Sequence, residues 1–414
     1  MAEVCDPEVY DIAVVGAGPA GSAAALSVLR ACPDARVALV DAAAFPRDKP
    51  CGDGIAPHAV EVLRDLHVPD ATAGYLPLHG MRLRSPGGVE LSIPLARPAW
   101  AIPRRVFDAR LHAAACARGA VPVRHRVRNL HMRPGERLVT LDREIAARVV
   151  IGADGAYSAV RRALRIPRNP PHALAVAVRG YARLADAEPA PAEMLIEMVA
   201  QGWPAYGWSF PIGDGTANVG YGELRSALGT AGPGKAHLHR SLSTLLPDQP
   251  PEAGSLRAHH LPLSTSRPRQ PDGPVLLVGD AASLVNPLTG EGIYYAVLSG
   301  MLAGDAAAAA VTGRAADPGA LYRAALRREL GRHLRHTGTI GRLARNRPQL
   351  MDTTARVARG RPKLLDGLTE LGLGRGTVRL RSVTHVTVAG LTSSARRASG
   401  ARNSLWRRES RRMD

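Results

Sequence analysis

Three glycines near the start of the chain have the spacing of a dinucleotide-binding turn. Gly16, Gly18 and Gly21 form a G-x-G-x-x-G pattern that follows an apolar run, residues 10–15, typical of a buried strand. The first glycine permits a tight turn, the second lets the backbone approach a pyrophosphate, and the third lets helix and strand pack closely. Asp41 ends a second apolar run and is placed to accept a hydrogen bond from a ribose hydroxyl. This segment predicts a dinucleotide whose phosphates lie at the N-terminus of the following helix.

Two later apolar runs also lead to acidic residues. One leads to Asp154, and a much later one leads to Asp280 and then to a stretch that contains Gly290 and Gly292. Together with the glycine turn, these elements resemble the flavoprotein hydroxylase superfamily. The resemblance implies FAD as the cofactor, with Asp280 on its ribityl or ribose hydroxyls and the two glycines bringing backbone N–H groups toward the isoalloxazine ring.

An arginine near the flavin diphosphate is another feature of that superfamily. Arg104 matches it, although its neighbour Arg105 is also a cation, and the sequence alone does not separate the two. The resemblance spans residues 10–292 and therefore covers most of the chain.

Aromatic residues are concentrated in residues 203–210, which hold four of the sixteen in the chain. Tyr206, Trp208 and Phe210 alternate, so they share one face of a predicted strand. Such a stripe is most often part of an ordinary core. Asp214 and Gly215 predict a hairpin turn after this strand.

A two-residue hairpin loop would fix which residues face each other. Trp208 would then lie opposite Tyr221, and Phe210 opposite Val219. The other face would consist almost entirely of backbone, because it would carry Gly207, Ser209, Gly220 and Gly222. Glycines inside a strand are costly and often mark the close approach of a ligand, which favours a binding surface over a plain core.

These aromatic residues also carry a second, more specific resemblance. Residues 206–222, with the pattern Y-x-W-x-F-P-x8-G-x-G, resemble a motif of the geranylgeranyl reductase family. Residues 45–54 are similar to that family's P-x-x-K-x-C-G-x-G segment, and residues 280–296 to its third segment. The Cys-Gly-Asp-Gly variant is most similar to the bacterial branch that reduces menaquinone side chains, which itself resembles tailoring oxidoreductases of natural-product pathways.

This resemblance implies reduction of C=C bonds in a prenyl or polyprenyl lipid, or in a related natural-product intermediate. Reduced flavin would deliver hydride from N5 to one alkene carbon, and an acid or water would protonate the other. An isolated alkene offers no oxyanion, so positioning, dry surroundings and aromatic stabilisation of cationic character must dominate. The candidate walls are Tyr206, Trp208, Tyr294 and Tyr295. Cys51 is a candidate polarisable group beside the flavin, with a buried inert cysteine as the alternative.

The composition limits the other classes of function. The 414 residues carry a formal charge of +18, and only three of the 54 basic residues are lysines, which suggests codon bias as well as selection. No zinc-finger spacing or basic zipper is present, so we expect no nucleic-acid partner. Four scattered cysteines and histidines without HxxxH spacing predict neither disulfides nor a metal site. An anionic membrane surface or a phosphorylated ligand accounts better for the charge.

Localisation is expected to be cytoplasmic. Residues 1–10 carry acids where a signal peptide needs cations, and no uncharged apolar run reaches membrane-spanning length. Residues 394–414 hold seven arginines and one tryptophan. This tail is either a solvated extension or a peripheral contact with the inner face of the membrane, where a polyprenyl substrate would reside.

The elements that must position these residues predict an α/β fold. We expect a Rossmann-like FAD-binding domain, interrupted by a mixed β-sheet substrate domain and followed by a helical C-terminus, with helix over residues 318–346. The predicted boundaries assign residues 1–75, 100–165 and 272–345 to the FAD-binding domain. Residues 76–99 and 166–271 form the substrate domain, and residues 346–414 form a helical C-terminal region with a basic tail.

Two rival functions use the same scaffold. A flavin monooxygenase would hydroxylate or epoxidise its substrate in a natural-product pathway, whereas a flavin halogenase would need a lysine near the substrate, and only Lys49 lies in a motif. The second rival is a non-catalytic prenyl carrier, which the intact glycine turn, Asp41 and Asp280 disfavour. The reductase hypothesis further requires an external electron donor, NAD(P)H or a reduced carrier.

Overall fold

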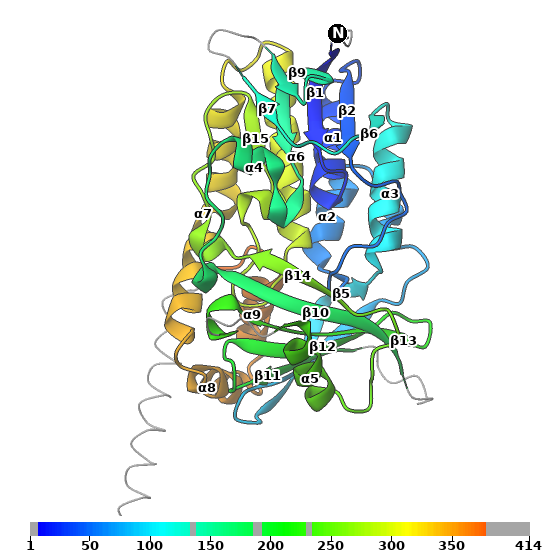
Figure 1. Ribbon diagram of the computed structural model, residues 1–414. Coiled ribbons are helices and arrows are strands. Elements are labelled where there is room, and N and C mark those ends of the chain that lie inside the picture. The colour runs from blue at the N-terminus through cyan, green and yellow to red at the C-terminus, as the bar shows by residue number, and fades with distance from the viewer. Residues whose placement is uncertain (1–6, 133–137, 185–192, 229–233, 378–414) are drawn as a thin grey trace, which may run out of the picture.

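Two β-sheets occupy opposite halves of the protein (Figure 1). The computed structural model describes residues 7–132, 138–184, 193–228 and 234–377. The predicted tail at residues 394–414 lies outside the described residues. The chain crosses between the two halves several times, and the functional residues gather where the halves meet.

The first sheet contains the predicted dinucleotide-binding strands. Its order is β6-β2-β1-β9-β8-β7, with β15 also paired to β9, and the pairs that surround β1 are parallel. Residues 12–15 of β1 are all buried, as the apolar run predicts. The strands are β1 (Glu8–Val15), β2 (Val37–Asp41), β6 (Val121–Arg124), β7 (Leu130–His131), β8 (Val139–Leu141), β9 (Ile145–Gly152) and β15 (Val275–Leu277).

The second sheet carries the aromatic stripe. Its order is β14-β10-β13-β12-β11-β4-β5-β3, and all neighbours are antiparallel except β11 and β4. Mixed pairing of this kind joins strands from separate parts of the sequence. The strands are β3 (Gly54–Ile55), β4 (Leu78–Arg84), β5 (Glu90–Ala101), β10 (Leu174–Arg183), β11 (Glu193–Val199), β12 (Ala205–Pro211), β13 (Thr216–Leu224) and β14 (Arg257–Pro262).

Helices cover the first sheet and connect the two halves. The longest helix, α7, runs beside both halves along one side of the molecule (Figure 1). Its Leu326, Leu330 and Leu334 are buried, as their spacing predicts. The helices are α1 (Pro19–Ala31), α2 (Pro57–Asp65), α3 (Arg104–Ala117), α4 (Ala159–Ala163), α5 (Lys235–Leu245), α6 (Ile293–Val311), α7 (Pro318–Ala344), α8 (Gln349–Ala358) and α9 (Pro362–Leu373).

The predicted fold class is confirmed, with one refinement at the C-terminus. Helices α8 and α9 do not stand apart from the substrate sheet, because Ala355, Ala358 and Leu365 share a core cluster with residues of β4 and β5. One helix of the described residues, α6, is long and apolar enough to cross a bilayer, but 78% of that window is buried inside the protein. It is the core helix that packs against α1.

The contact between α1 and α6 depends on two glycines. A Cβ at Gly300 would lie 2.1 Å from the carbonyl oxygen of Ala20, and one at Gly304 would lie 2.5 Å from that of Ala24. Backbone atoms cannot move aside as a flexible side chain can. The small residues of α6 therefore fix how closely α1, and with it the glycine turn, sits on the core.

We predict opposite effects of one substitution at two helical glycines. Gly300→Ala should lower the free energy of unfolding by about 1–3 kcal/mol, since the added methyl overpacks the α1–α6 contact. Gly367→Ala, on the exposed face of α9 with open space around it, should raise it by up to about 1 kcal/mol through helix propensity. Denaturant titration measures both, and equal effects would contradict the packing described for α6.

Candidate active site

The first part of the site is the turn between β1 and α1. Gly16 has φ of +101°, and a Cβ at Gly21 would lie 1.7 Å from the carbonyl oxygen of Gly16, so both positions require glycine. Helix α1 has no side-chain N-cap and no acidic residue in its first turn. Its first N–H groups are therefore available to an anion, which the helix dipole also favours.

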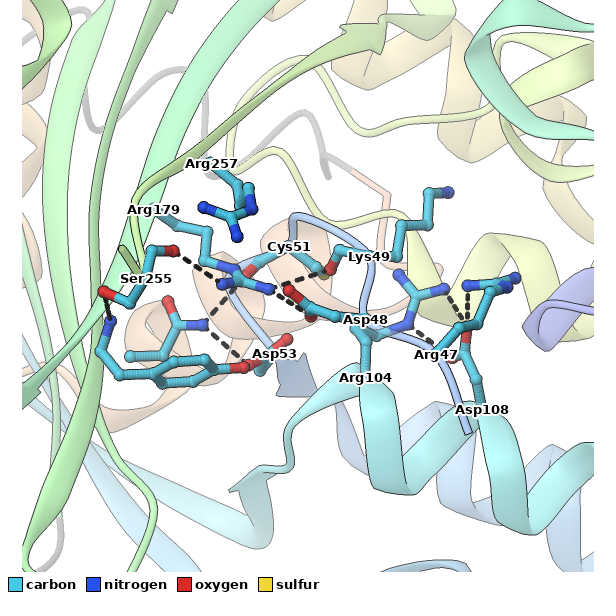
Figure 2. Close-up of polar contacts among 12 residues, drawn as sticks. Arg47, Asp48, Lys49, Cys51, Asp53, Arg104, Asp108, Arg179, Ser255 and Arg257 are labelled. Atoms are coloured by element: carbon cyan, nitrogen blue, oxygen red, sulfur yellow. Dashed lines mark hydrogen bonds and ion pairs between the residues drawn. The ribbon is translucent and has the colours of Figure 1, made fainter. Parts of the chain in front are cut away.

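Two arginines face this uncapped helix end. The Cβ that Gly18 lacks would lie 3.5 Å from the guanidinium of Arg47 and 3.8 Å from that of Arg104. Arg104 is buried and binds Asp108 through two hydrogen bonds of 2.6 and 2.8 Å, while Arg105 is exposed (Figure 2). The structure thus separates the two adjacent arginines that the sequence left open, with Arg104 on the cavity.

The glycine turn, Arg47, Arg104 and three aspartates line one end of a cavity, which we call the FAD cradle. The three aspartates have different surroundings. Asp41 accepts the N–H of Ala17 at 2.9 Å, at the end of β2. Asp280 lies 3.7 Å from the ammonium of Lys49 and lines the cavity. The Asp154 carboxylate accepts the backbone N–H of Ala159 and Val160, at the start of α4. Asp154 therefore holds the local backbone, and it also lines the cavity.

The aromatic stripe lies on β12, but the predicted hairpin register is wrong by one residue. Trp208 pairs with Gly220 rather than Tyr221, and Phe210 pairs with Asn218 rather than Val219. The loop has three residues instead of two, since the N–H of Ile212 bonds the carbonyl of Thr216. Gly213 and Gly215 both have positive φ, which the longer loop requires.

This register places glycines on the same face as the aromatic rings. A Cβ at Gly220 would lie 2.1 Å from the Trp208 ring, so the indole lies directly over that glycine. The predicted backbone-only face does not exist, because Tyr221 and Val219 occupy it together with Gly207 and Ser209. Gly220 makes room for the indole, and Gly222 lines the cavity.

Glycines of two other segments contact the same stripe. A Cβ at Gly52 would lie 3.4 Å from Trp208, one at Gly54 would lie 3.4 Å from Phe210, and one at Gly290 would lie 2.7 Å from the Tyr206 hydroxyl. That hydroxyl donates a 2.5 Å hydrogen bond to the carbonyl of Thr289. Residues 45–54, here called the motif loop, and residues 286–292 are therefore pressed onto β12. All three motifs singled out in the sequence meet at this strand.

A cavity of about 730 Å³ connects the cradle to the stripe. One end is lined by Gly16, Gly18, Asp41 and Arg47, and the middle by Cys51, Tyr206 and Trp208. The far end is apolar, with side chains from β4, β5, β11, α8 and α9 that include Met81, Ile93, Met194, Ile196, Met351 and Leu368. The contribution of α8 and α9 was not predicted, since nothing local in their sequence indicates which sheet they cover.

Two of the predicted wall residues lie elsewhere. Tyr294 and Tyr295 do not line the cavity; α6 begins at Ile293, and its helical turn directs Ile293 and Ala296 inward instead. The Tyr295 hydroxyl is buried and lies 2.9 Å from His333 of α7, and Tyr294 packs on His58 of α2. These tyrosines stabilise the core behind the site.

Cys51 is where the sequence predicts it, on the cavity between the cradle and the stripe. Burial raises the pKa of its thiol, and the nearby Arg104 guanidinium opposes that effect. Its carbonyl accepts a 2.9 Å hydrogen bond from the Asn218 side chain of β13. The thiol is therefore a neutral, polarisable group at neutral pH.

The motif loop also carries a buried acid that sequence reasoning missed. Asp53 is fully buried and has a positive φ of 59°. One carboxyl oxygen accepts hydrogen bonds from Tyr181 at 2.7 Å and Asn218 at 2.8 Å, and the other has no partner among the described residues. Burial raises the pKa of Asp53 to about 6, against the effect of the Tyr181 hydrogen bond and the Arg179 charge. Its place between two glycines of the motif was the only signal in the sequence.

Arg179 of β10 is the other missed residue. Its guanidinium is 2% exposed, pairs with Asp48 and donates to the carbonyl of Ser255 at 3.2 Å (Figure 2). It also lies over the ring of Tyr181, 4.8 Å from its centroid. A cation on the substrate sheet thus holds the motif loop from the side opposite to Arg104.

Two further titratable groups line the cavity. Burial raises the pKa of Glu291 to about 7, although the Glu291 carboxylate accepts the Tyr294 N–H at 2.8 Å. Burial and the Lys49 charge lower the pKa of His259 to about 4, so that its imidazole is neutral. Glu291 is therefore a cavity carboxyl that exchanges a proton near neutral pH.

The residues present fit FAD. The uncapped helix end and the two arginines suit a diphosphate, and Asp41 and Asp280 both line the cavity with carboxylates that can accept hydrogen bonds from hydroxyl groups. The cavity continues from this cradle into its apolar far end, here called the chamber, which a second, hydrophobic molecule can fill. The fold and site define an FAD-dependent oxidoreductase.

Comparisons with known proteins identify the family. Residues 9–328 match the family described as "FAD binding domain". The chain is 35% identical over 311 residues to the menaquinone reductase of Mycobacterium tuberculosis, covering 71% of this chain and 76% of the relative. It is 31% identical over 324 residues to digeranylgeranylglycerophospholipid reductase 2 of Methanopyrus kandleri, covering 73% and 78%. The chain belongs to this FAD-binding family of geranylgeranyl and menaquinone reductases, and the predicted resemblance is confirmed.

A solved structure agrees with the fold. The geranylgeranyl bacteriochlorophyll reductase-like protein of Thermoplasma acidophilum superimposes with a TM-score of 0.70. The match covers 92% of this chain and 96% of that protein at 22% identity. FAD is the cofactor of the family, as the glycine turn predicted.

The pH dependence of stability tests the surroundings of Asp53. Because its folded-state pKa of about 6 lies above the usual 3.8, the native state holds an extra proton between these values, and stability falls as pH rises through the window. Asp53→Asn keeps both hydrogen bonds to an oxygen and cannot ionise. Relative to wild type it should gain about 2–3 kcal/mol in unfolding free energy between pH 4 and pH 7.

Chemical denaturation at a series of pH values measures this gain. The matched control is Asp366→Asn, at an exposed aspartate of α9, which should follow the wild-type curve. Parallel curves for wild type and Asp53→Asn would show that Asp53 does not take up a proton on folding.

Proposed function

We propose that the protein reduces C=C bonds of a prenyl or polyprenyl chain, or of a natural-product intermediate that carries one. The observation that supports this most is the continuity of the cavity from the FAD cradle to an apolar chamber walled by Trp208 and Tyr206. Reduced FAD supplies the hydride. The protein's own contribution is to hold the alkene beside the cofactor and to exclude water.

The walls of the chamber suit an unactivated alkene. Trp208 is 6% exposed and lines the cavity, and its indole N–H donates to the Asn218 side chain at 2.9 Å. An aromatic face stabilises developing positive charge. Cys51 adds a neutral polarisable thiol to the same region of the cavity.

We propose Glu291 as the group that donates the proton to the second alkene carbon. It lines the cavity beside Gly290 and Gly292, and its pKa of about 7 leaves part of the population protonated at neutral pH. A general acid works best when its pKa is near the working pH. Cys51 is a weaker donor, because burial raises the pKa of its thiol.

We further propose that the electrons come from NAD(P)H or a reduced carrier, since the glycine turn serves FAD itself. Two relatives are named as reductases of menaquinone and of digeranylgeranylglycerophospholipid. A cytoplasmic protein that meets the inner face of the membrane could collect such a substrate.

The oxygen requirement separates this function from its rival. With dithionite-reduced protein, a prenylated lipid and no air, the product should be two mass units heavier and should contain deuterium when the solvent is heavy water. A monooxygenase would instead require air and add one oxygen atom. Mass spectrometry with labelled O₂ decides, and an oxygenated product formed only in air would overturn the reductase proposal while leaving the FAD fold intact.

Truncation of aromatic residues tests the chamber. Trp208→Ala should lower turnover at least about tenfold at saturating FAD, because the alkene loses its wall, while FAD affinity changes much less. Tyr221→Ala is the matched control, since that ring is on the neighbouring strand and faces away from the cavity. Similar losses of turnover in both variants would refute the assignment of Trp208 to the substrate.

The pH profile of turnover tests the proton donor. Turnover should fall as pH rises through about 7, where Glu291 ionises. Glu291→Gln should slow the reaction by about 10²-fold or more and remove that limb of the profile. Glu329→Gln, on α7 outside the cavity, is the control. If turnover of Glu291→Gln still fell as pH rose through about 7, a group other than Glu291 would be the proton donor.

A further inference from the structure

A second cavity lies behind one wall of the first. Leu263 lines the main cavity, and the next residue, Ser264, lines a separate cavity of about 230 Å³ between residues 264–267 and helix α7. Water occupies about 30 Å³ per molecule in the liquid, so this space admits a small polyatomic ion. We call it the arginine pocket; it is lined by Ser264, Thr265, Arg267, Leu334, Arg335, Gly338, Thr339 and Arg342.

Two hydroxyl groups in the arginine pocket lack a partner. Ser264 is fully buried, and its hydroxyl, like that of Thr265, is shielded from solvent and makes no hydrogen bond with any described residue. Leaving a buried polar group unpaired costs about 1–3 kcal/mol. Two such groups side by side in one cavity are explained if a ligand accepts their hydrogen bonds.

Three arginines surround the same space without a counter-ion. Within the described residues no carboxylate pairs with Arg267, Arg335 or Arg342, whereas Arg323 and Arg328 of the same helix α7 each have one. Arg267 donates to the carbonyl of Ser264 at 3.0 Å, which anchors it at the pocket. Three unpaired cations at one cavity repel each other and attract an anion.

The helix leaves room for that anion. Gly338 is a buried residue of α7, yet a Cβ built on it would meet nothing within 4 Å. A larger residue would enter the pocket at this turn of the helix. In the described part of the chain, the pocket, the two hydroxyls without hydrogen-bond partners and the three arginines without counter-ions therefore lie together.

We propose that the arginine pocket binds a phosphate-type oxyanion, either inorganic phosphate or diphosphate, or the phosphate headgroup of a lipid. Planar guanidinium groups bind phosphate oxygens in pairs, and the Ser264 and Thr265 hydroxyls donate to the oxygen at the buried end. The site is distinct from the FAD cradle, which uses Arg47 and Arg104. It does not depend on the proposed redox reaction.

A bound anion would act on the wall of the main cavity. The N–H of Ser264 donates to the carbonyl of Val285 at 2.9 Å, and both Leu263 and Val285 line the main cavity. The occupant of the arginine pocket is thus one residue away from the chamber where the substrate is proposed to lie. It would hold residues 263–265 and α7 together at that wall.

Calorimetric titration of the FAD-loaded protein with inorganic diphosphate at constant ionic strength tests the site. Loading with FAD keeps the probe out of the cofactor cradle. The double substitution Arg335→Gln and Arg342→Gln should weaken binding at least about tenfold, the loss expected for charge-assisted hydrogen bonds. Arg332→Gln, an exposed arginine of α7 that does not line the pocket, should change it less than about twofold.

Gly338→Glu gives a second, independent variant. Its carboxylate would enter the open space in the pocket, so diphosphate binding should vanish while the absorbance of bound FAD stays as in wild type. A parallel arm measures sedimentation with phosphatidylglycerol vesicles against neutral phosphatidylcholine vesicles. Arginine-dependent binding of free diphosphate identifies a soluble ligand, and arginine-dependent binding of the anionic vesicles alone identifies a headgroup. Binding that the substitutions leave unchanged, or no binding in either arm, would overturn the proposal.

Discussion

The motif loop is held by charged groups from both halves of the protein, and the cavity exists because this loop is fixed. From the FAD half, the fully buried Asp108 of α3 pairs with Arg47 of the loop at 3.2 Å. From the substrate half, Arg179 pairs with Asp48 while almost entirely removed from solvent. Because Arg179 is buried, its charge needs the Asp48 partner, and this ties the substrate sheet to the loop. Neither half can therefore shift without breaking contacts that the other half needs.

Close packing between glycines and aromatic rings supplies the second constraint. Trp208 lies over Gly220 on its own sheet and against Gly52 of the motif loop. Tyr206 reaches the backbone beside Gly290, in the segment that follows Asp280. One strand thus sets the distance between the loop, the cofactor segment and the substrate chamber. Trp208 and Tyr206 each contact backbone at these positions, which cannot move aside as a flexible side chain can.

Sequence reasoning succeeded where the signal is local. The strand, turn and helix around Gly16, the fold class and FAD follow from apolar runs, glycine spacing and acids at strand ends. The hairpin register was wrong because Gly213 and Gly215 allow a three-residue loop as readily as a two-residue one, and a shift of one residue exchanges the faces of the strand.

The remaining differences come from contacts between distant segments. The orientation of Tyr294 depends on where α6 begins, and a glycine-rich stretch does not show that position. The buried network of Asp53, Tyr181 and Arg179 joins residues more than a hundred positions apart. The closure of the chamber by α8 and α9 likewise depends on tertiary packing. A single sequence holds the residue types for these contacts but not their partners.

If cofactor and alkene meet in one continuous, water-poor cavity, hydride passes directly between them. Stopped-flow absorbance tests this: protein with fully reduced FAD is mixed with a polyprenyl substrate in the absence of oxygen. We expect the yellow absorbance of oxidised flavin to return at a rate that rises with substrate concentration and saturates. Flavin that stays reduced until oxygen is admitted, whatever the substrate concentration, would contradict it.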